Sequence, residues 1–259
     1  MAEAIVPSRP VALITGASSG IGEQFARRYA REQFDLILVA RSGDTLQALA
    51  TELMTRHKIA VDVHVADLAE TMDLVRLVDR IANDLPRLDH LVNCAGAAPE
   101  GDLADTDEQA LRQMVDLNIT ALTLLTRAGV IRMREAGSGT IVNVASAAAY
   151  QPMPHLAAYA ASKSYVLMLT EAMSEENRGY GLRILAVSPG ATETPMNPGV
   201  AKGKRKPEHV VNTAWEALSG TAPSVVDGRS NKVMATLSSR VLPKSFGLRV
   251  AERMMRDKA

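Results

Sequence analysis

The chain has one cysteine, Cys94, among its 259 residues, so it holds neither an internal disulfide nor a cysteine-based metal cluster. Its 29 basic residues balance 29 acidic ones, and no global field points to nucleic acid or a membrane. No apolar run approaches the roughly 18–20 residues that span a bilayer. The N-terminus lacks the basic region and apolar core of a signal peptide, and the five histidines show no metal-ligand spacing. We therefore expect a cytoplasmic globular protein without a metal.

Short apolar runs alternate with longer helical patterns along most of the chain. Near-continuous apolar runs are typical of parallel strands covered on both faces. The runs are Val11–Thr15, Leu36–Ala40, Val61–Val65, Leu88–Asn93, Thr140–Val144 and Arg183–Ser188, with helical patterns at roughly 20–31, 44–57, 70–85, 107–135 and 158–178. This alternation predicts an α/β fold, a doubly wound and mostly parallel sheet of the Rossmann type, in a single domain over 1–259.

Two segments raise the question of partners. The helical pattern at 107–135 has apolar residues on more than one face, which fits burial against the sheet and contact with a second subunit equally well. The basic stretch Gly199–Pro207 is expected to be a solvated loop rather than an anion site.

The tail from Ser239 predicts a basic amphipathic helix. Its apolar stripe contains Phe246, Val250 and Met254 at four-residue spacing. We expect the helix to pack on its own core or on another subunit. Contact of 239–258 with an anionic membrane, or with a lipid-like substrate, is the alternative.

A glycine-rich segment joins the first predicted strand to the first predicted helix. It reads Thr-Gly-Ala-Ser-Ser-Gly-Ile-Gly over 15–22, with glycines at Gly16, Gly20 and Gly22. Glycines let the backbone turn sharply and approach a pyrophosphate, and a helix N-terminus offers free N–H groups to that anion. No Lys-Ser/Thr pair follows, so the segment is not a Walker loop. It predicts a dinucleotide-binding cradle.

The end of the second predicted strand favours NADP over NAD. An acid about 20 residues beyond the glycines would bond the adenine ribose and select NAD, but Ala40 and Arg41 occupy that place. An arginine fork suits a 2′-phosphate, and Ser18 and Ser42 could add hydroxyl donors. We predict a preference for NADP(H), with use of NAD(H) left open. The alternative for Arg41 is a solvated loop arginine.

Tyr159 and Lys163 are four residues apart in a helical pattern, so they share one face. A phenol has an ordinary pKa of about 10, and a nearby cation favours its charged form. The hydroxyl of Ser146, thirteen residues before the tyrosine, could hold a carbonyl oxygen. The three residues could therefore move a proton on and off an alcohol. The Y-x-x-x-K spacing alone is a weak signal, because both residues are ordinary on helix surfaces.

As a set, these motifs resemble those of the short-chain dehydrogenase/reductase family, in its order and spacing from residue 11 to about 195. The matching positions are 15–22, Asp67-Leu68, Asn93-Cys94-Ala95-Gly96, Asn118, Ser146, Tyr159 with Lys163, Pro189-Gly190 and Thr194. The resemblance implies an NAD(P)-dependent oxidoreductase that acts on CH–OH groups and assembles as a homodimer or homotetramer. It also implies that 195–259 shapes the substrate pocket.

The resemblance gives each position a role. Ser146 would hold the substrate oxygen, Tyr159 would be the acid/base, and Lys163 would bind the nicotinamide ribose and lower the tyrosine pKa. Asn118 would position a water in a proton relay to Lys163, and Asp67 would bond the adenine amino group. The implied cofactor-binding residues are Gly16, Ser18, Ser19, Gly20, Ile21, Gly22, Arg41, Asp67, Leu68, Asn93, Ala95, Gly96, Tyr159, Lys163, Pro189, Gly190, Thr192 and Thr194.

Individual residues also have structural interpretations. Asp67 could be a helix N-cap, Asn118 could tie a helix to a neighbouring strand, and Ser146 could be a turn serine. Cys94 stands where the family usually has a second asparagine, and a small buried side chain is its expected role. His155 is expected to be a loop histidine, with contact to substrate as the alternative.

The sequence thus predicts an NADP(H)-preferring oxidoreductase that interconverts a small-molecule ketone or aldehyde and an alcohol, with Tyr159 as acid/base. Two alternatives remain. One is a membrane-associated reductase of 3-oxoacyl, steroid or retinoid ketones. The other is a nucleotide-binding regulator that keeps the fold without turnover.

Overall fold

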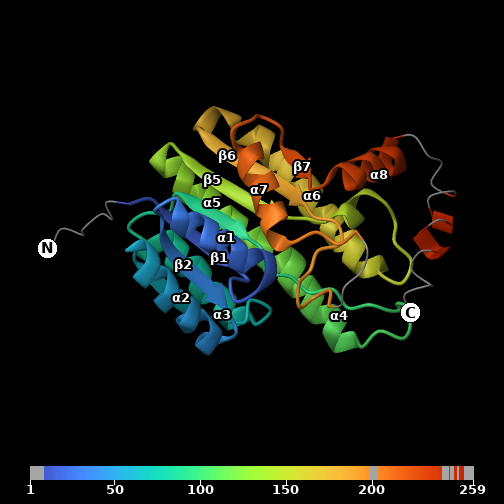
Figure 1. Ribbon diagram of the computed structural model, residues 1–259, viewed down its shortest axis with the longest axis horizontal. Helices are drawn as coiled ribbons and strands as arrows, with labels where there is room; N and C mark the ends of the chain where they lie inside the picture. Colours follow the sequence, from blue (N-terminus) through green and yellow to red (C-terminus); the bar gives the residue numbers. More distant parts are fainter. Residues whose placement is uncertain (1–8, 199–202, 241–244, 246–247, 250, 254–259) are drawn as a thin grey trace, which may run out of the picture.

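The computed structural model describes residues 9–198, 203–240, 245, 248–249 and 251–253. Its centre is a seven-stranded sheet in the order β3-β2-β1-β4-β5-β6-β7, with every neighbouring pair parallel (Figure 1). The strands are β1 (Val11–Thr15), β2 (Asp35–Ala40), β3 (Val61–Val65), β4 (His90–Asn93), β5 (Gly139–Val144), β6 (Leu182–Ser188) and β7 (Ser224–Val226). All six predicted strands are confirmed, and β7 is additional.

Helices cover both faces of this sheet (Figure 1). They are α1 (Gly20–Arg31), α2 (Gly43–His57), α3 (Thr71–Asp79), α4 (Glu108–Val115), α5 (Leu122–Ala136), α6 (Ala157–Glu176), α7 (Pro207–Leu218) and α8 (Arg229–Arg240). The predicted doubly wound Rossmann architecture is therefore confirmed. The sequence patterns did not indicate α7, or the part of α8 before Ser239.

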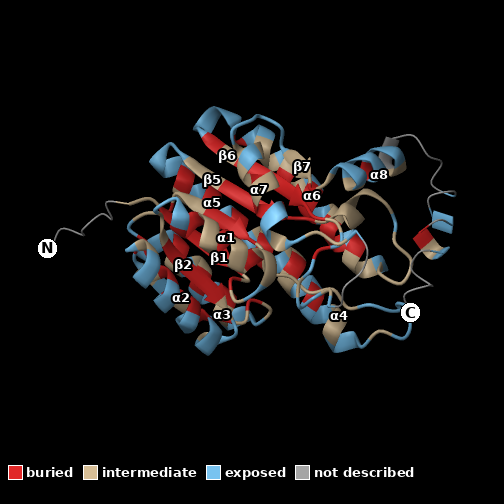
Figure 2. Cartoon of the chain, in the orientation of Figure 1, coloured by how far each residue is buried: buried red, intermediate tan, exposed pale blue. Residues whose placement is uncertain are grey.

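Alternating side chains of the central strands enter two different cores. In β1, Ala12 and Ile14 pack with α1, α2 and α7, whereas Val11 and Leu13 pack with α3 and α5 on the other face. All five residues of β1 are buried, which Figure 2 shows as a red centre beneath blue outer helix faces. Burial on both faces explains why the strands read as continuous apolar runs.

The predicted helix at 107–135 is a continuous helical stretch with an irregularity. A π-helical turn, Asp116–Ala121, separates α4 from α5. By length and composition alone the 29 residues Glu108–Ala136 could cross a membrane, which the apolar-run criterion had not indicated. Half of the most apolar part is buried inside the fold, and Gly129 lies so close to β4 that a Cβ would come 2.8 Å from a methyl of Leu91. These contacts are those of a core helix.

The basic stretch before α7 differs from its prediction. Residues 199–202 lie outside the described part of the chain, but Pro207 begins α7 and Arg205 pairs with a buried carboxylate, Asp227. The expectation of a solvated loop is therefore wrong for Arg205. The sequence could not show this, because the partner lies 22 residues away.

The C-terminal tail is described only in part. Residues 245, 248–249 and 251–253 are helical, and Ala251 is buried. Phe246, Val250 and Met254, which form the predicted apolar stripe, lie outside the described residues.

Candidate active site

A cavity of about 330 Å³ opens at the carboxyl ends of the parallel strands. Parallel α/β sheets bind ligands at this edge because successive strand ends and helix N-termini meet there. Of the predicted site residues, eighteen line the cavity: Gly16, Ser18, Ser19, Gly20, Ile21, Gly22, Arg41, Asp67, Leu68, Ala95, Gly96, Ser146, Tyr159, Lys163, Pro189, Gly190, Thr192 and Thr194. Asn93 and Asn118 do not line it. The structure thus brings predicted residues between Gly16 and Thr194 to one place.

The glycine segment is packed so tightly that side chains would not fit. A Cβ on Gly22 would lie 2.1 Å from the carbonyl oxygen of Gly16, and a Cβ on Gly16 would lie 2.9 Å from the backbone nitrogen of Ala95. Gly16 has a φ of 67°, in the left-handed region that favours glycine. Ser19 is the N-cap of α1, and its side chain makes no capping hydrogen bond. The first N–H groups of α1 therefore face the cavity as an anion site, which fits a pyrophosphate.

Arg41 and Asp67 face each other at one end of the cavity. An Arg41 guanidinium nitrogen, Nη1, lies 3.6 Å from Asp67 Oδ2, and the arginine side chain is 75% exposed. An ion pair this long and this exposed is weak, so the guanidinium can turn to a ligand phosphate. Asp67 Oδ1 accepts a hydrogen bond from the backbone nitrogen of Ala69. The N-cap of α3 is Glu70, so the N-cap interpretation of Asp67 is wrong.

Ser146 is a turn serine that also lines the cavity. Its Oγ accepts a 3.1 Å hydrogen bond from the backbone nitrogen of Ala148 and so caps a short 3₁₀ turn, Ala147–Tyr150. It also lines the cavity just beyond the end of β5.

Tyr159 and Lys163 both line the cavity from α6, one helical turn apart. Lys163 Nζ lies 5.9 Å from the centre of the Tyr159 ring and donates a 2.8 Å hydrogen bond to the carbonyl oxygen of Val144. Burial lowers the pKa of Lys163 to about 8, with a smaller opposing effect from Cys94. Burial raises the pKa of Tyr159, and hydrogen bonding to Ser146 opposes that rise. The surrounding side chains alone therefore do not make the phenol acidic.

Asn118 lies in the π-helical turn and is buried. Its side chain bonds the backbone nitrogen and oxygen of Ala97, each at 2.9 Å, and Ser162 Oγ at 3.0 Å. It therefore ties this helix to the loop after β4 and to α6, much as the structural interpretation expects. A Cβ on Gly96 would lie 3.2 Å from Asn118 Oδ1 and 3.5 Å from Lys163 Nζ. The asparagine and the lysine thus approach the same glycine.

Asn93 points away from the cavity. Its amide nitrogen donates to Thr126 Oγ1 at 3.0 Å and to Asn143 Oδ1 at 2.9 Å, beneath α5. Its neighbour Cys94 lines the cavity instead. Burial raises the pKa of the Cys94 thiol to about 12, so this residue is a neutral part of the wall rather than a nucleophile.

His155 lies in the loop before α6 and does not line this cavity. Its Nδ1 is 2.5 Å from Asp102 Oδ1, and its Nε2 is 3.0 Å from Glu252 Oε2. It joins three segments of the chain, which agrees with the expectation of a loop histidine.

Sequence reasoning missed several cavity residues. They are Val39, Ala66, Leu117, Val144, Ala145, Pro195, Met196 and Asn197. Most are small or apolar residues with no chemistry of their own to mark them. For Val39, Ala66, Val144 and Ala145, the position at or just after a strand end was the signal available.

Comparison with known proteins identifies the family. Residues 10–205 match the family model described as short chain dehydrogenase. The chain is 36% identical over 186 residues to sulfoacetaldehyde reductase 2 of Chromohalobacter salexigens, covering 71% of this chain and 73% of that protein.

Solved structures agree in fold. A short-chain dehydrogenase from Sphingobium yanoikuyae, in complex with NADPH, has a TM-score of 0.81 at 31% identity, covering 90% of this chain and 96% of that one. The bulky-bulky ketone specific alcohol dehydrogenase of Comamonas testosteroni has a TM-score of 0.80 at 30% identity, covering 91% and 96%. The chain therefore belongs to the short chain dehydrogenase family and is an oxidoreductase that acts on CH–OH groups.

Proposed function

We propose that the protein is an NADP(H)-preferring carbonyl reductase that converts a ketone or aldehyde to an alcohol. One observation carries the proposal. The glycine cradle at the start of α1 and the residues Ser146, Tyr159 and Lys163 line one cavity. A cofactor held by the cradle can therefore extend to Ser146, Tyr159 and Lys163, whose side chains are able to move a proton. Related proteins named as reductases and ketone-specific dehydrogenases support the same reaction class.

The cofactor preference rests on Arg41. It lies beside the glycine cradle at the end of β2, with most of its side chain exposed and one weak ion pair. A guanidinium there can bind a 2′-phosphate with two N–H donors. Ser18 and Ser42 line the same part of the cavity and can add hydroxyl groups. A related structure that contains NADPH supports this assignment.

In the proposed reaction the protein supplies orientation and one proton, and NADPH supplies the hydride when it is bound. The Ser146 hydroxyl donates a hydrogen bond to the substrate carbonyl oxygen. The Tyr159 hydroxyl gives its proton to that oxygen as the carbonyl carbon is reduced, and the phenolate regains a proton from solvent. A neutral tyrosine is the required acid, and the raised pKa keeps it protonated at neutral pH.

Lys163 assists from the same face of α6. As a buried cation it stabilises the phenolate that forms, and its hydrogen bond to Val144 holds it at the end of β5. Asn118 fixes the loop at Ala97 and packs against the same glycine as the lysine. We propose that Asn118 positions the proton path toward Lys163 rather than contacting substrate.

We also propose that the protein works as a homodimer or homotetramer. Leu124 and Ile131 on α5, and Tyr165 and Met168 on α6, are large apolar side chains between 38% and 72% exposed. The two helices adjoin, since Thr123 Oγ1 lies 2.9 Å from Tyr165 Oη. A second copy of the chain would cover these side chains. Met168→Glu should lower the molar mass measured by light scattering, and an unchanged mass would count against this surface.

The decisive experiment pairs a substrate screen with one substitution. NADPH oxidation is followed across ketone and aldehyde classes, with NADH as the parallel cofactor. Tyr159→Phe should lower kcat by about 10²–10⁴-fold and leave the Kd for NADPH within about two-fold. Tyr180→Phe, at an exposed tyrosine just beyond the end of α6 and outside the cavity, is the control and should keep full activity. A wild type that binds NADPH but reduces nothing would favour the regulator.

A further inference from the structure

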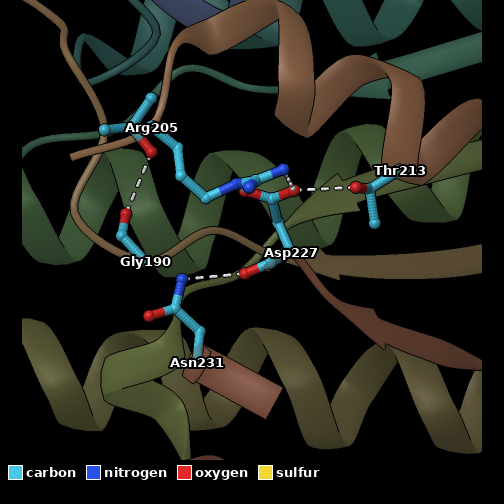
Figure 3. Close-up of polar contacts among 6 residues, drawn as sticks. Gly190, Arg205, Thr213, Asp227 and Asn231 are labelled. Atoms are coloured by element: carbon cyan, nitrogen blue, oxygen red, sulfur yellow. Dashed lines mark hydrogen bonds and ion pairs between the residues drawn. The ribbon is translucent and has the colours of Figure 1, made fainter. Parts of the chain in front are cut away.

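The part of the cavity wall that follows β6 is supported by an ion pair between Arg205 and the buried carboxylate of Asp227. Asp227, directly after β7, is fully buried and accepts two hydrogen bonds from Arg205, at 2.6 and 3.0 Å (Figure 3). Thr213 Oγ1 of α7 donates to the same carboxylate at 2.7 Å. A bidentate arginine–carboxylate pair fixes both distance and orientation. Arg205 is therefore held rigidly against β7 and α7.

The backbone of Arg205 forms hydrogen bonds with the segment that lines the cavity and so limits the movement of that segment. Its N–H donates to the carbonyl oxygen of Ala191, and its carbonyl oxygen accepts from the N–H of Glu193, both at 2.9 Å. These two bonds flank Thr192, which lines the cavity and whose hydroxyl donates to the Gly190 carbonyl oxygen at 3.0 Å. The position of Thr192 is thus set by a residue that does not itself line the cavity.

A second contact supports the same wall. Asn231 of α8 donates from Nδ2 to the Asp227 carbonyl oxygen at 2.8 Å (Figure 3). Its side chain lies so close to Gly190 that a Cβ there would come 2.1 Å from Nδ2. The backbone of Asp227 in turn donates to the Ser188 carbonyl oxygen at the end of β6. Asp227 therefore contacts the end of β6 and the helices α7 and α8, and through Arg205 it supports the cavity wall.

We propose that Arg205, Asp227 and Asn231 are positioning residues for the nicotinamide end of the cofactor, an assignment that rests on the proposed function. They hold the wall formed by Gly190 and Thr192 at the distance that hydride transfer requires. Small displacements of reacting groups lower the reaction rate strongly. A cavity wall formed by a loop does not by itself hold such groups in a fixed position. The rigidity comes from the ion pair, because separating it would leave the buried carboxylate of Asp227 without its charged partner.

The test uses Arg205→Lys, which keeps the charge and loses the two-pronged contact. The Kd for NADPH should rise at least ten-fold by fluorescence titration. With the best ketone from the screen, the primary isotope effect on kcat from C4-deuterated NADPH should increase, because hydride transfer becomes slower than the other steps. Arg27→Lys is the matched control. It disrupts an equally bidentate pair, Arg27–Glu52, and should change neither quantity.

Unchanged binding and an unchanged isotope effect in a folded Arg205→Lys protein would overturn the positioning role. If Arg205→Lys does not fold, the same two measurements are made on Asn231→Ala, which leaves the ion pair in place. A wild-type Kd for NADPH and a wild-type isotope effect in that variant would also overturn the positioning role. A wild type that does not bind NADPH would instead refute the proposed function. The two failures are therefore distinguishable.

Discussion

Lys163 Nζ donates a 2.8 Å hydrogen bond to the carbonyl oxygen of Val144, the last residue of β5. The hydrogen bond thereby connects the ammonium group on α6 to the carboxyl end of β5. Ser146 follows two residues after Val144 in the chain. This contact fixes the distance between the helix that carries Tyr159 and the strand end that carries the serine. It also keeps a charge in a buried place, where burial lowers the pKa of Lys163 to about 8.

Replacing this lysine should make the protein more stable and inactive. The pKa of Lys163 is lower in the folded protein than its ordinary value of 10.5, so its charge opposes folding fully below pH 8. This cost disappears as the pH rises from about 8 to 10.5, where the unfolded chain binds more protons than the folded one. Lys163→Met should therefore raise the free energy of unfolding at pH 7 by about 1–3 kcal/mol, after loss of the Val144 hydrogen bond.

Urea unfolding at pH 7 and pH 9.5 measures this effect. The advantage of Lys163→Met should shrink at the higher pH. A variant that is less stable than wild type at pH 7 would show that the hydrogen bond outweighs the cost of the buried charge.

In the glycine cradle, a side chain at Gly22 should clash with the backbone. A Cβ on Gly22 would lie 2.1 Å from a backbone oxygen, which a rotamer change cannot relieve. Gly22→Ala should destabilise the fold by about 1–3 kcal/mol and weaken NADPH binding at least ten-fold. Gly179→Ala is the control, because a Cβ there meets nothing within 4 Å. Thermal unfolding and fluorescence titration measure both effects, and a Gly22→Ala protein with wild-type affinity would disprove the cradle.

Arg41→Met tests the phosphate contact without adding a new charge. Loss of a charge-assisted hydrogen bond costs about 1.5–3 kcal/mol, so kcat/KM with NADPH should fall about 10- to 100-fold while kcat/KM with NADH stays the same. Arg112→Met removes an arginine of equal exposure, 75%, on α4 and should affect neither cofactor. Equal losses with both cofactors would show that Arg41 does not bind the 2′-phosphate.

His90, a partly buried histidine at the start of β4, predicts acid sensitivity. Burial lowers the pKa of His90 to about 4, and His90 Nδ1 lies 2.9 Å from Tyr29 Oη. Between pH 6.5 and 4 the unfolded chain binds a proton that the folded protein does not, so stability falls with acidification, by up to about 3 kcal/mol.

The double substitution Tyr29→Phe/His90→Leu removes the titrating group and its partner together. The stability of this protein should fall less between pH 7 and pH 4 than that of wild type. Trp215, the single tryptophan, packs on the Tyr29 ring with centres 5.2 Å apart, so its fluorescence reports unfolding. Parallel pH curves for the two proteins would contradict the assignment to His90.

Patterns within short stretches of sequence determined the architecture and most of the cavity. The runs that became β1 to β6 were recognisable because most of these strands are covered on both faces and are therefore mostly apolar. Gly16, Gly20 and Gly22 were recognisable because steric limits act between neighbours in the chain. Tyr159 and Lys163 were recognisable because helical periodicity alone places them on one face.

Only the tertiary structure decided how distant residues meet. Asn93 looked like a cavity residue and instead bonds Asn143 beneath α5. Arg205 looked like part of a solvated loop and instead pairs with the buried Asp227. The π-helical turn at Asn118 and the three-residue strand β7 leave too little periodicity to recognise. In each case the residue's position depends on a contact between segments far apart in sequence. The free energy of such a contact comes from packing and burial, which no local sequence pattern encodes.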